Sequence, residues 1–122
     1  MTDIVVEQKY IDYWRSRIAK RIAREKACEA AAWVTVREAA CLLKSQFGAT
    51  RVIVFGSLVR DLFGEDSDID IAVEGIKDNR FFEALTAVNE LGDRQIDLKP
   101  VESLEPRFKA RVLETGRVVD AS

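Results

Sequence analysis

Three aspartates alternate with apolar residues in segments that otherwise have the composition of buried β-strands. Asp68 and Asp70 lie in the stretch DIDIAV, and Asp97 lies in QIDLK. Successive side chains of a strand point to opposite faces, so the first two aspartates share one face while the isoleucines between them point into the core. A buried carboxylate is costly unless a cation or a hydrogen-bond donor compensates it. If the two strands pair, the pattern predicts a cation site at the three aspartates.

The donor set of this cation site consists of oxygen atoms. The chain has no histidine and only two cysteines, which excludes Ser-His-Asp and Cys-His catalysis and the usual zinc sites. Oxygen ligands suit Mg²⁺, with Mn²⁺ as the alternative, and Mg²⁺ usually completes its shell with water and substrate phosphates. A calcium-binding loop beginning at Asp66 is excluded, because Ile71 stands at the glycine position and Lys77 at the position of the closing glutamate.

A Gly-Ser pair follows the preceding strand-like segment, RVIVF. Gly56 and Ser57 offer backbone N–H groups and a hydroxyl to an anion, and glycine lets the backbone approach that anion closely. Beside metal-binding carboxylates, such a turn predicts a triphosphate site. The chemistry indicated is in-line phosphoryl or nucleotidyl transfer.

These motifs resemble a known family. Gly56-Ser57, ten intervening residues and Asp68-Ile69-Asp70 match the GSX10DXD signature of the minimal nucleotidyltransferases (MNT) of the DNA polymerase β superfamily. The similarity extends from about Trp33 to Val119. It implies a nucleotidyltransferase fold.

The resemblance also implies a role for each residue of the motif. Gly56 and Ser57 would hold the triphosphate of ATP or another NTP. Asp68 and Asp70 would bind two Mg²⁺ ions, and Asp97 would complete one metal site and help to deprotonate the acceptor hydroxyl. Arg60, in the turn, would reach a phosphate or remain a solvated surface residue. The family often has glycine directly after this arginine, where the present chain has Asp61.

A partner protein follows from the same resemblance. Many family members of this size are antitoxins of HEPN-type toxin ribonucleases, and some transfer AMP to a tyrosine of the toxin. In 122 residues we expect no separate acceptor-binding domain, so the acceptor is expected on a partner protein, with nucleic acid not the direct substrate. Two alternatives stay open. One is a non-catalytic protein that neutralises its partner by occlusion, and the other is a small-molecule (antibiotic-type) nucleotidyltransferase.

The surrounding segments predict an α+β fold in which a short mixed β-sheet is flanked by helices. Helix-favouring composition without Pro or Gly extends from about Glu7 to Phe47, and an interruption in its Ala-rich middle stays open. The remaining elements are strands at 51–55, 67–73, 95–99 and 117–119, a helix at 79–91 capped by Asp78, and a helix ending near 115. We expect an N-terminal helical arm (1–47) and a catalytic core (48–122).

The N-terminal arm is basic. Residues 15–26 contain six Lys/Arg opposed only by Glu25, which indicates either a solvated helix face or docking to an acidic partner or an RNA backbone. The apolar spacing of Ile11, Trp14, Ile18 and Ile22 predicts packing on the body or a homodimer through this helix. No segment reads as a membrane span or a signal peptide, so we expect a cytoplasmic location.

Overall fold

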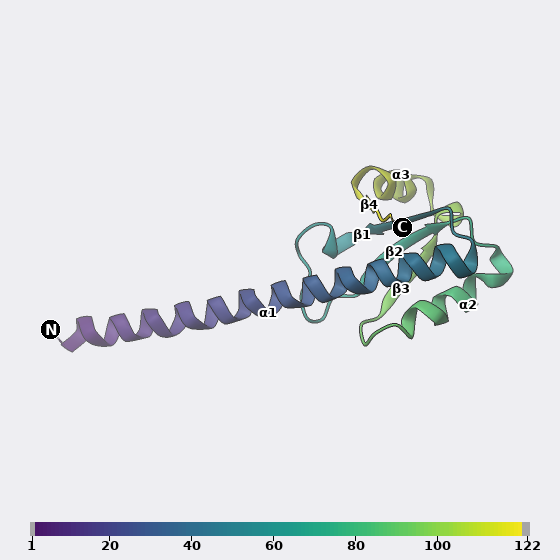
Figure 1. Ribbon diagram of the computed structural model, residues 1–122. Helices are drawn as coiled ribbons and strands as arrows, with labels where there is room; N and C mark the ends of the chain where they lie inside the picture. Colours follow the sequence, from purple (N-terminus) through teal and green to yellow (C-terminus); the bar gives the residue numbers. More distant parts are fainter. Residues whose placement is uncertain (1, 121–122) are drawn as a thin grey trace.

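The computed structural model describes residues 2–120. Its elements follow one another along the chain as shown in Figure 1: α1 (Thr2–Phe47), β1 (Arg51–Phe55), the 3₁₀ turn η1 (Gly56–Leu58), β2 (Ile69–Glu74), α2 (Asp78–Asn89), β3 (Ile96–Pro100), the 3₁₀ turn η2 (Val101–Ser103), α3 (Pro106–Thr115) and β4 (Arg117–Val118). The strand order is β3-β2-β1-β4. Strands β2 and β3 are parallel and the other pairs are antiparallel. The predicted mixed sheet with a long N-terminal helix is confirmed.

Helices cover both faces of the sheet (Figure 1). On one face, alternate strand residues such as Ile69, Ile71 and Ile96 form a buried cluster with apolar side chains of α1 and α2. On the other face, Ile53 and its neighbours pack with residues of α3. The period-two alternation of strand side chains produces these two separate layers.

Helix α1 is continuous through its Ala-rich middle, which answers the question that its composition left open. In its C-terminal part, Val36, Ala40 and Leu43 are fully buried against the sheet. Its N-terminal part extends away from the body (Figure 1), and the side chains from Ile11 to Ile22 that were predicted to pack are exposed. The alternative in which this stripe packs on the body is therefore wrong. The division of the chain after residue 47 stays a prediction.

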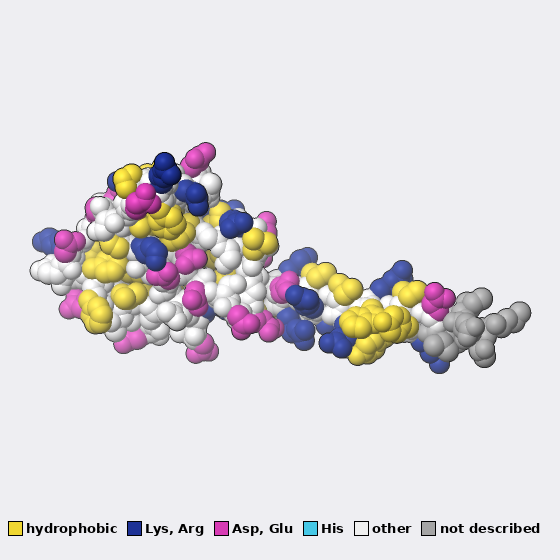
Figure 2. Space-filling model, turned by 180° about the vertical axis from the view of Figure 1, so that it is seen from behind, with side chains coloured by type: hydrophobic (Ala, Val, Ile, Leu, Met, Phe, Trp, Pro, Cys, Tyr) yellow, Lys and Arg dark blue, Asp and Glu magenta, His cyan; other side chains and the backbone are white. Residues whose placement is uncertain are grey.

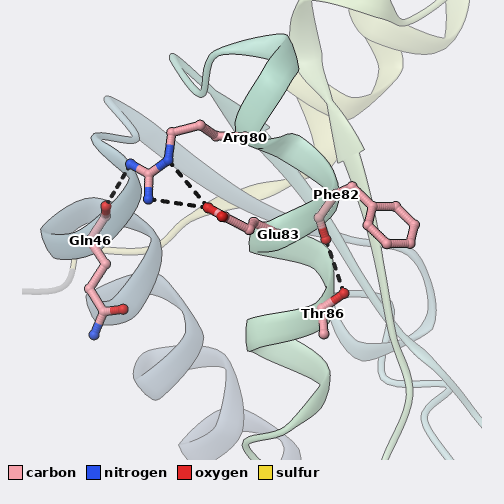
Figure 3. Close-up of polar contacts among 5 residues, drawn as sticks. All are labelled: Gln46, Arg80, Phe82, Glu83 and Thr86. Atoms are coloured by element: carbon pink, nitrogen blue, oxygen red, sulfur yellow. Dashed lines mark hydrogen bonds and ion pairs between the residues drawn. The ribbon is translucent and has the colours of Figure 1, made fainter.

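The C-terminal end of α1 is fixed by α2. The last carbonyls of a helix have no partner within the helix, and the Arg80 guanidinium donates a hydrogen bond to the carbonyl of Gln46 at 3.1 Å. The same guanidinium lies over the Phe47 ring, 4.6 Å from its centroid, and pairs with Glu83. Figure 3 shows this contact, with Phe82 pointing away from α1. The contact anchors the long helix to the body.

Two predicted details of the elements are wrong. The N-cap of α2 is Lys77 with extended backbone, and Asp78 is the first helical residue, without a side-chain capping bond. The second strand begins at Ile69 and not at residue 67, because residues 64–67 close a turn in which Ser67 N–H donates to the Gly64 carbonyl at 3.2 Å. Among the helices of residues 2–120, none has the length and hydropathy needed to cross a bilayer.

Candidate active site

Strand register brings the predicted site residues together at one end of the sheet. Strand β1 ends where β2 begins, and their antiparallel pairing sets Phe55 opposite Asp70. On the other side of β2, parallel pairing sets Asp70 beside Asp97. The Gly56-Ser57 turn directly follows Phe55. The turn and two of the three aspartates therefore occupy neighbouring positions on three adjacent strands.

The turn approaches the carboxylate of Asp70 at Gly56. Its φ of +78° lies in the left-handed region that favours glycine. A Cβ added at this position would lie 2.4 Å from Oδ2 of Asp70, well inside van der Waals contact. Only glycine lets the backbone of the turn approach this carboxylate so closely.

Asp70 is the carboxylate with the most perturbed environment. Its pKa is raised, first by burial and then by the charge of Asp97, while Lys99 lowers it and Asp68 raises it. Asp70 and Asp97 are each partly buried, whereas Asp68, which directly precedes β2, is exposed. Burial first, and then the negative charges of Asp97 and Asp68, therefore disfavour ionisation of Asp70.

Lys99 compensates part of this negative charge. It lies two residues after Asp97 on β3 and therefore on the same face, and its Nζ donates to Oδ2 of Asp97 at 2.9 Å. Within the part of the chain that the structure describes, no three His, Cys, Asp or Glu side chains converge tightly enough to hold one ion. Asp70 and Asp97 nevertheless give a pair of oxygen ligands in register, and Mg²⁺ is commonly held by one or two carboxylates together with substrate phosphates and water. The residues thus fit a Mg²⁺ ion whose remaining ligands are nucleotide phosphates and water.

Arg94 holds the loop that leads to Asp68. One of its guanidinium nitrogens donates to three backbone carbonyls of this loop, those of Gly64 (3.3 Å), Glu65 (2.9 Å) and Ser67 (2.6 Å). The guanidinium also lies over the Phe63 ring, 4.7 Å from its centroid. Sequence reasoning missed this residue, because a single arginine before a strand carries no signal of the loop that it will contact.

Asn89 fixes the start of the strand that carries Asp97. Its side-chain amide accepts a hydrogen bond from the Ile96 N–H at 2.7 Å and donates one to the Ile96 carbonyl at 3.0 Å. Strand β3 lies at the edge of the sheet, so these backbone groups have no further strand to pair with. The last residue of α2 therefore substitutes for a neighbouring strand, a role that no pattern in the sequence indicated.

The remaining predicted phosphate ligands lie in the turn after β1. Ser57 is partly buried, and its hydroxyl makes no hydrogen bond to any described residue. Arg60 is exposed and its N–H donates to the Gly56 carbonyl at 3.2 Å, but no contact of its side chain with the carboxylates is seen within residues 7–120. Asp61 has a φ of +57°, the left-handed conformation in which glycine is preferred.

A groove of about 730 Å³ lies beside Asp68, between α1 and the loop held by Arg94, and Asp70 and Asp97 are not among its lining residues. Its floor consists of small α1 residues, including Cys28, Ala31 and Ala32, and its wall includes Asp66 and Asp68. This volume lies in the range of small-molecule sites. The acidic wall disfavours a triphosphate and suits a neutral or basic group that approaches Asp68.

Comparison with known proteins agrees with this geometry. The family model of the nucleotidyltransferase domain matches residues 36–119, and no curated protein matches the chain. A solved structure described as a candidate minimal nucleotidyltransferase is 33% identical with a TM-score of 0.57, and the match covers 66% of this chain and 86% of that chain.

Two other similar structures come from toxin–antitoxin complexes. One, described as a toxin–antitoxin with AMP-PNP, is 20% identical with a TM-score of 0.59 and is matched over 72% of this chain and 73% of that one. The other, described as the toxin–antitoxin MntA-HepT, is 19% identical with a TM-score of 0.56 and is matched over 74% and 73%. At this identity they support the fold. With the family match over residues 36–119, they confirm the resemblance seen in the sequence: the chain belongs to the nucleotidyltransferase domain family.

Proposed function

We propose that this protein transfers a nucleoside monophosphate, AMP from ATP as the first candidate, to a hydroxyl group of a partner protein, and that the partner is a HEPN-type toxin. The observation that carries the proposal is the continuous row of Phe55, Asp70 and Asp97 across three strands, with Gly56 in contact distance of Asp70. This row combines a phosphate-binding turn with paired carboxylates, as nucleotidyl transfer requires.

Each residue of the row has a defined task in this proposal. The backbone N–H groups of the turn and the free Ser57 hydroxyl bind the phosphates of the NTP. Asp70 and Asp97 would hold one Mg²⁺ ion, and Asp68 together with Asp70 would hold a second; when bound, Mg²⁺ polarises the phosphate and neutralises developing charge. The acceptor oxygen forms a bond to the α-phosphorus as the bond from this phosphorus to the bridging oxygen of the β-phosphate breaks. Pyrophosphate leaves, and the Asp97 carboxylate accepts the hydroxyl proton.

The toxin–antitoxin role of the proposal has its own support. Two of the similar structures are described as toxin–antitoxin complexes, one of them with the ATP analogue AMP-PNP. The groove beside Asp68 has small side chains along α1, among them Cys28, Ala31 and Ala32, which leaves room for a group of another protein next to this aspartate.

Intact-mass spectrometry of the co-purified partner tests the proposal. Incubation with ATP and Mg²⁺ is expected to add one or more AMP masses to the partner, and the Asp68→Ala variant is expected to add none. An unmodified partner that this variant still inhibits fully would favour neutralisation by occlusion. A mass gain on an antibiotic-type small molecule, with none on the partner, would favour the small-molecule transferase.

Arg94 is expected to be a positioning residue for Asp68. Arg94→Lys keeps the charge but loses the donation of one guanidinium to three carbonyls, so we expect the transfer rate kcat to fall by about tenfold, while the KM for the NTP stays unchanged. Steady-state kinetics at several NTP concentrations measure the two constants. The control is Arg111→Lys, an exposed arginine of α3, which should change neither. A loss confined to KM would contradict this role.

Asp61 is expected to weaken nucleotide binding. It places a negative charge in the turn that receives the triphosphate, so removing the charge should tighten NTP binding by about twofold or more. Asp61→Asn removes the charge and tolerates the left-handed backbone, and Asp61→Gly also relieves the conformation. Isothermal titration with a non-hydrolysable NTP compares the two variants. Unchanged affinity in both would show that Asp61 lies too far from the phosphates to matter.

A further inference from the structure

The N-terminal half of α1 carries large apolar side chains that remain exposed. From here on, the arm denotes residues 7–26 alone, the exposed segment within the predicted N-terminal helical arm (1–47). The exposed fractions of its apolar residues lie between 38% and 63%, for Tyr10, Ile11, Tyr13, Trp14, Ile18 and Ile22. Figure 2 shows apolar patches along the arm, surrounded by Lys and Arg. Contiguous exposed apolar surface with a polar rim is typical of protein interaction sites.

The apolar residues of the arm lie on the helix face that contacts the body further along the chain. At about 100° per residue, Ile11 and Ile18 point in nearly the same direction as Val36, which is fully buried against the sheet. A partner that covers Ile11 and Ile18 is therefore placed on the side of α1 on which the sheet lies.

The arm also emerges at the end of the body that carries the candidate active site. Nε of Arg24 lies 3.7 Å from Oε1 of Glu65, which belongs to the loop leading to Asp68. The groove that contains Asp68 begins at Ala27 of the same helix, directly after the arm. A partner bound along the arm is thus adjacent to this groove.

Charge decides which partner fits the arm. The arm has seven Lys/Arg against three Asp/Glu, a net charge of +4. By helical geometry, Arg15 and Lys26 flank one side of the apolar stripe, and Arg17, Arg21 and Arg24 flank the other. Two such arms would place like charges next to each other, which disfavours a second copy. The exposed aromatic side chains Tyr10, Tyr13 and Trp14 lie at the N-terminal end of the arm, whereas residues 15–26, with six of the seven Lys/Arg, contain no aromatic residue for the base stacking that a single-stranded RNA would use.

We infer that the arm is the docking surface for a partner protein that presents an amphipathic helix whose apolar seam is flanked by Asp and Glu. This inference rests on the proposed function, since the docked protein is the one that bears the acceptor hydroxyl. The arm binds the partner through the Ile11–Ile22 stripe and its basic flanks, and the bound partner lies next to the groove that contains Asp68.

Two synthetic helical peptides of about 20 residues test the chemistry of this surface with the full chain. They share one leucine seam, and one peptide has Glu and the other Lys at the flanking positions. By fluorescence anisotropy, the Glu peptide is expected to bind at least about tenfold more tightly than the Lys peptide, and its affinity should fall as salt is raised.

Variants of the arm show where the peptide binds. The double variant Trp14→Ala/Ile18→Ala keeps residues that favour helix and is expected to weaken binding of the Glu peptide by about tenfold or more. The control Phe82→Ala removes an exposed phenylalanine of α2 that points away from α1 (Figure 3) and should bind as wild type does. Circular dichroism verifies that the arm variant retains its helix.

Several outcomes would overturn the inference. These are equal binding of the two peptides, no binding of either, a dimer that the arm variant converts to monomer in analytical ultracentrifugation, or tighter binding of polyuridine RNA than of the Glu peptide. The peptide-binding test does not depend on nucleotide transfer. The Asp70→Asn variant, which is expected to lose transfer, should still bind the Glu peptide normally. Peptide binding without nucleotide transfer would refute the proposed function alone. Transfer that is unaffected in the arm variant would refute the inference alone.

Discussion

Asp70→Asn is expected to lower nucleotide transfer by well over 100-fold. Loss of a group that only supports a metal ligand typically costs 10- to 100-fold, and Asp70 stands between the phosphate turn and Asp97 in the strand register. The amide nearly preserves the shape of the side chain, so the turn at Gly56 should remain in place. The rate of NMP incorporation at saturating NTP and Mg²⁺ measures the effect. The control Asp78→Asn changes an exposed aspartate of α2 and should retain full activity.

The same substitution is expected to stabilise the protein in the absence of metal. Burial, the Asp97 charge and the Asp68 charge raise the pKa of Asp70 against the opposing effect of Lys99. A carboxyl whose pKa is higher in the folded than in the unfolded chain favours folding below its unfolded pKa, and this contribution is lost as the pH rises through the folded value. The unfolded value is 3.8, so the wild type loses this contribution as the pH rises above about 4, whereas Asp70→Asn does not.

Thermal unfolding in the presence of a chelator checks this expectation. The Tm of Asp70→Asn should exceed that of the wild type at about pH 7, and the difference should shrink towards about pH 4. Added Mg²⁺ should raise the Tm of the wild type more than that of the variant, because ligands that bind the folded state stabilise it. A variant that is less stable than the wild type at neutral pH would show that Asp70 is a structural residue.

Gly56→Ala is expected to have the second largest effect, on stability and on activity together. The new Cβ would lie 2.4 Å from Oδ2 of Asp70, in a residue whose φ is +78°. The left-handed conformation alone costs about 1–2 kcal/mol for a residue with a Cβ, and relief of the contact requires the turn or the carboxylate to move. Displacement of either group by about 1 Å can reduce the rate by about 100-fold.

Gly48→Ala is a matched control for the backbone conformation. Gly48 has a φ of +74°, but nothing lies within 4 Å of an added Cβ. The difference in unfolding free energy between the two variants therefore measures the contact with Asp70. In the double variant Gly56→Ala/Asp70→Ala, this difference should largely disappear, which chemical denaturation can show. Equal costs for Gly56→Ala and Gly48→Ala would mean that the turn and the carboxylate are not in contact.

The local pattern of the chain was sufficient to predict its elements and the central row of the site. Alternating aspartates and isoleucines identified the strands and the face of Asp70 and Asp97, because strand geometry has a strict period of two. Pairing of the second and third strands was a condition of the predicted cation site, and the parallel register of β2 and β3 meets it. Composition alone predicted the long helix, although the exposure of its N-terminal stripe did not follow from spacing.

The groups that hold the site in place could not be predicted from the sequence. These groups are the side chains of Arg94, Asn89 and Lys99, and each contacts a segment that the fold or the orientation of the side chain brings near. Arg94, for example, contacts a loop almost thirty positions earlier in the chain. No periodicity links Arg94 or Asn89 to its partner, whereas Lys99 lies two residues after Asp97 and the strand period places both on one face. Likewise, the sequence located Asp68 in the strand, whereas the turn closed by Ser67 places it just before β2.

The position of the label that ATP transfers tests the central claim most directly. The purified protein and its co-purified partner are incubated with Mg²⁺ and with ATP labelled at either the α- or the γ-phosphate. We predict that the partner retains the α-label, that pyrophosphate carries the γ-label in equal amount, and that Asp70→Asn abolishes both. Retention of the γ-label on the partner, or α-labelling that persists in Asp70→Asn, would contradict nucleotidyl transfer at this site.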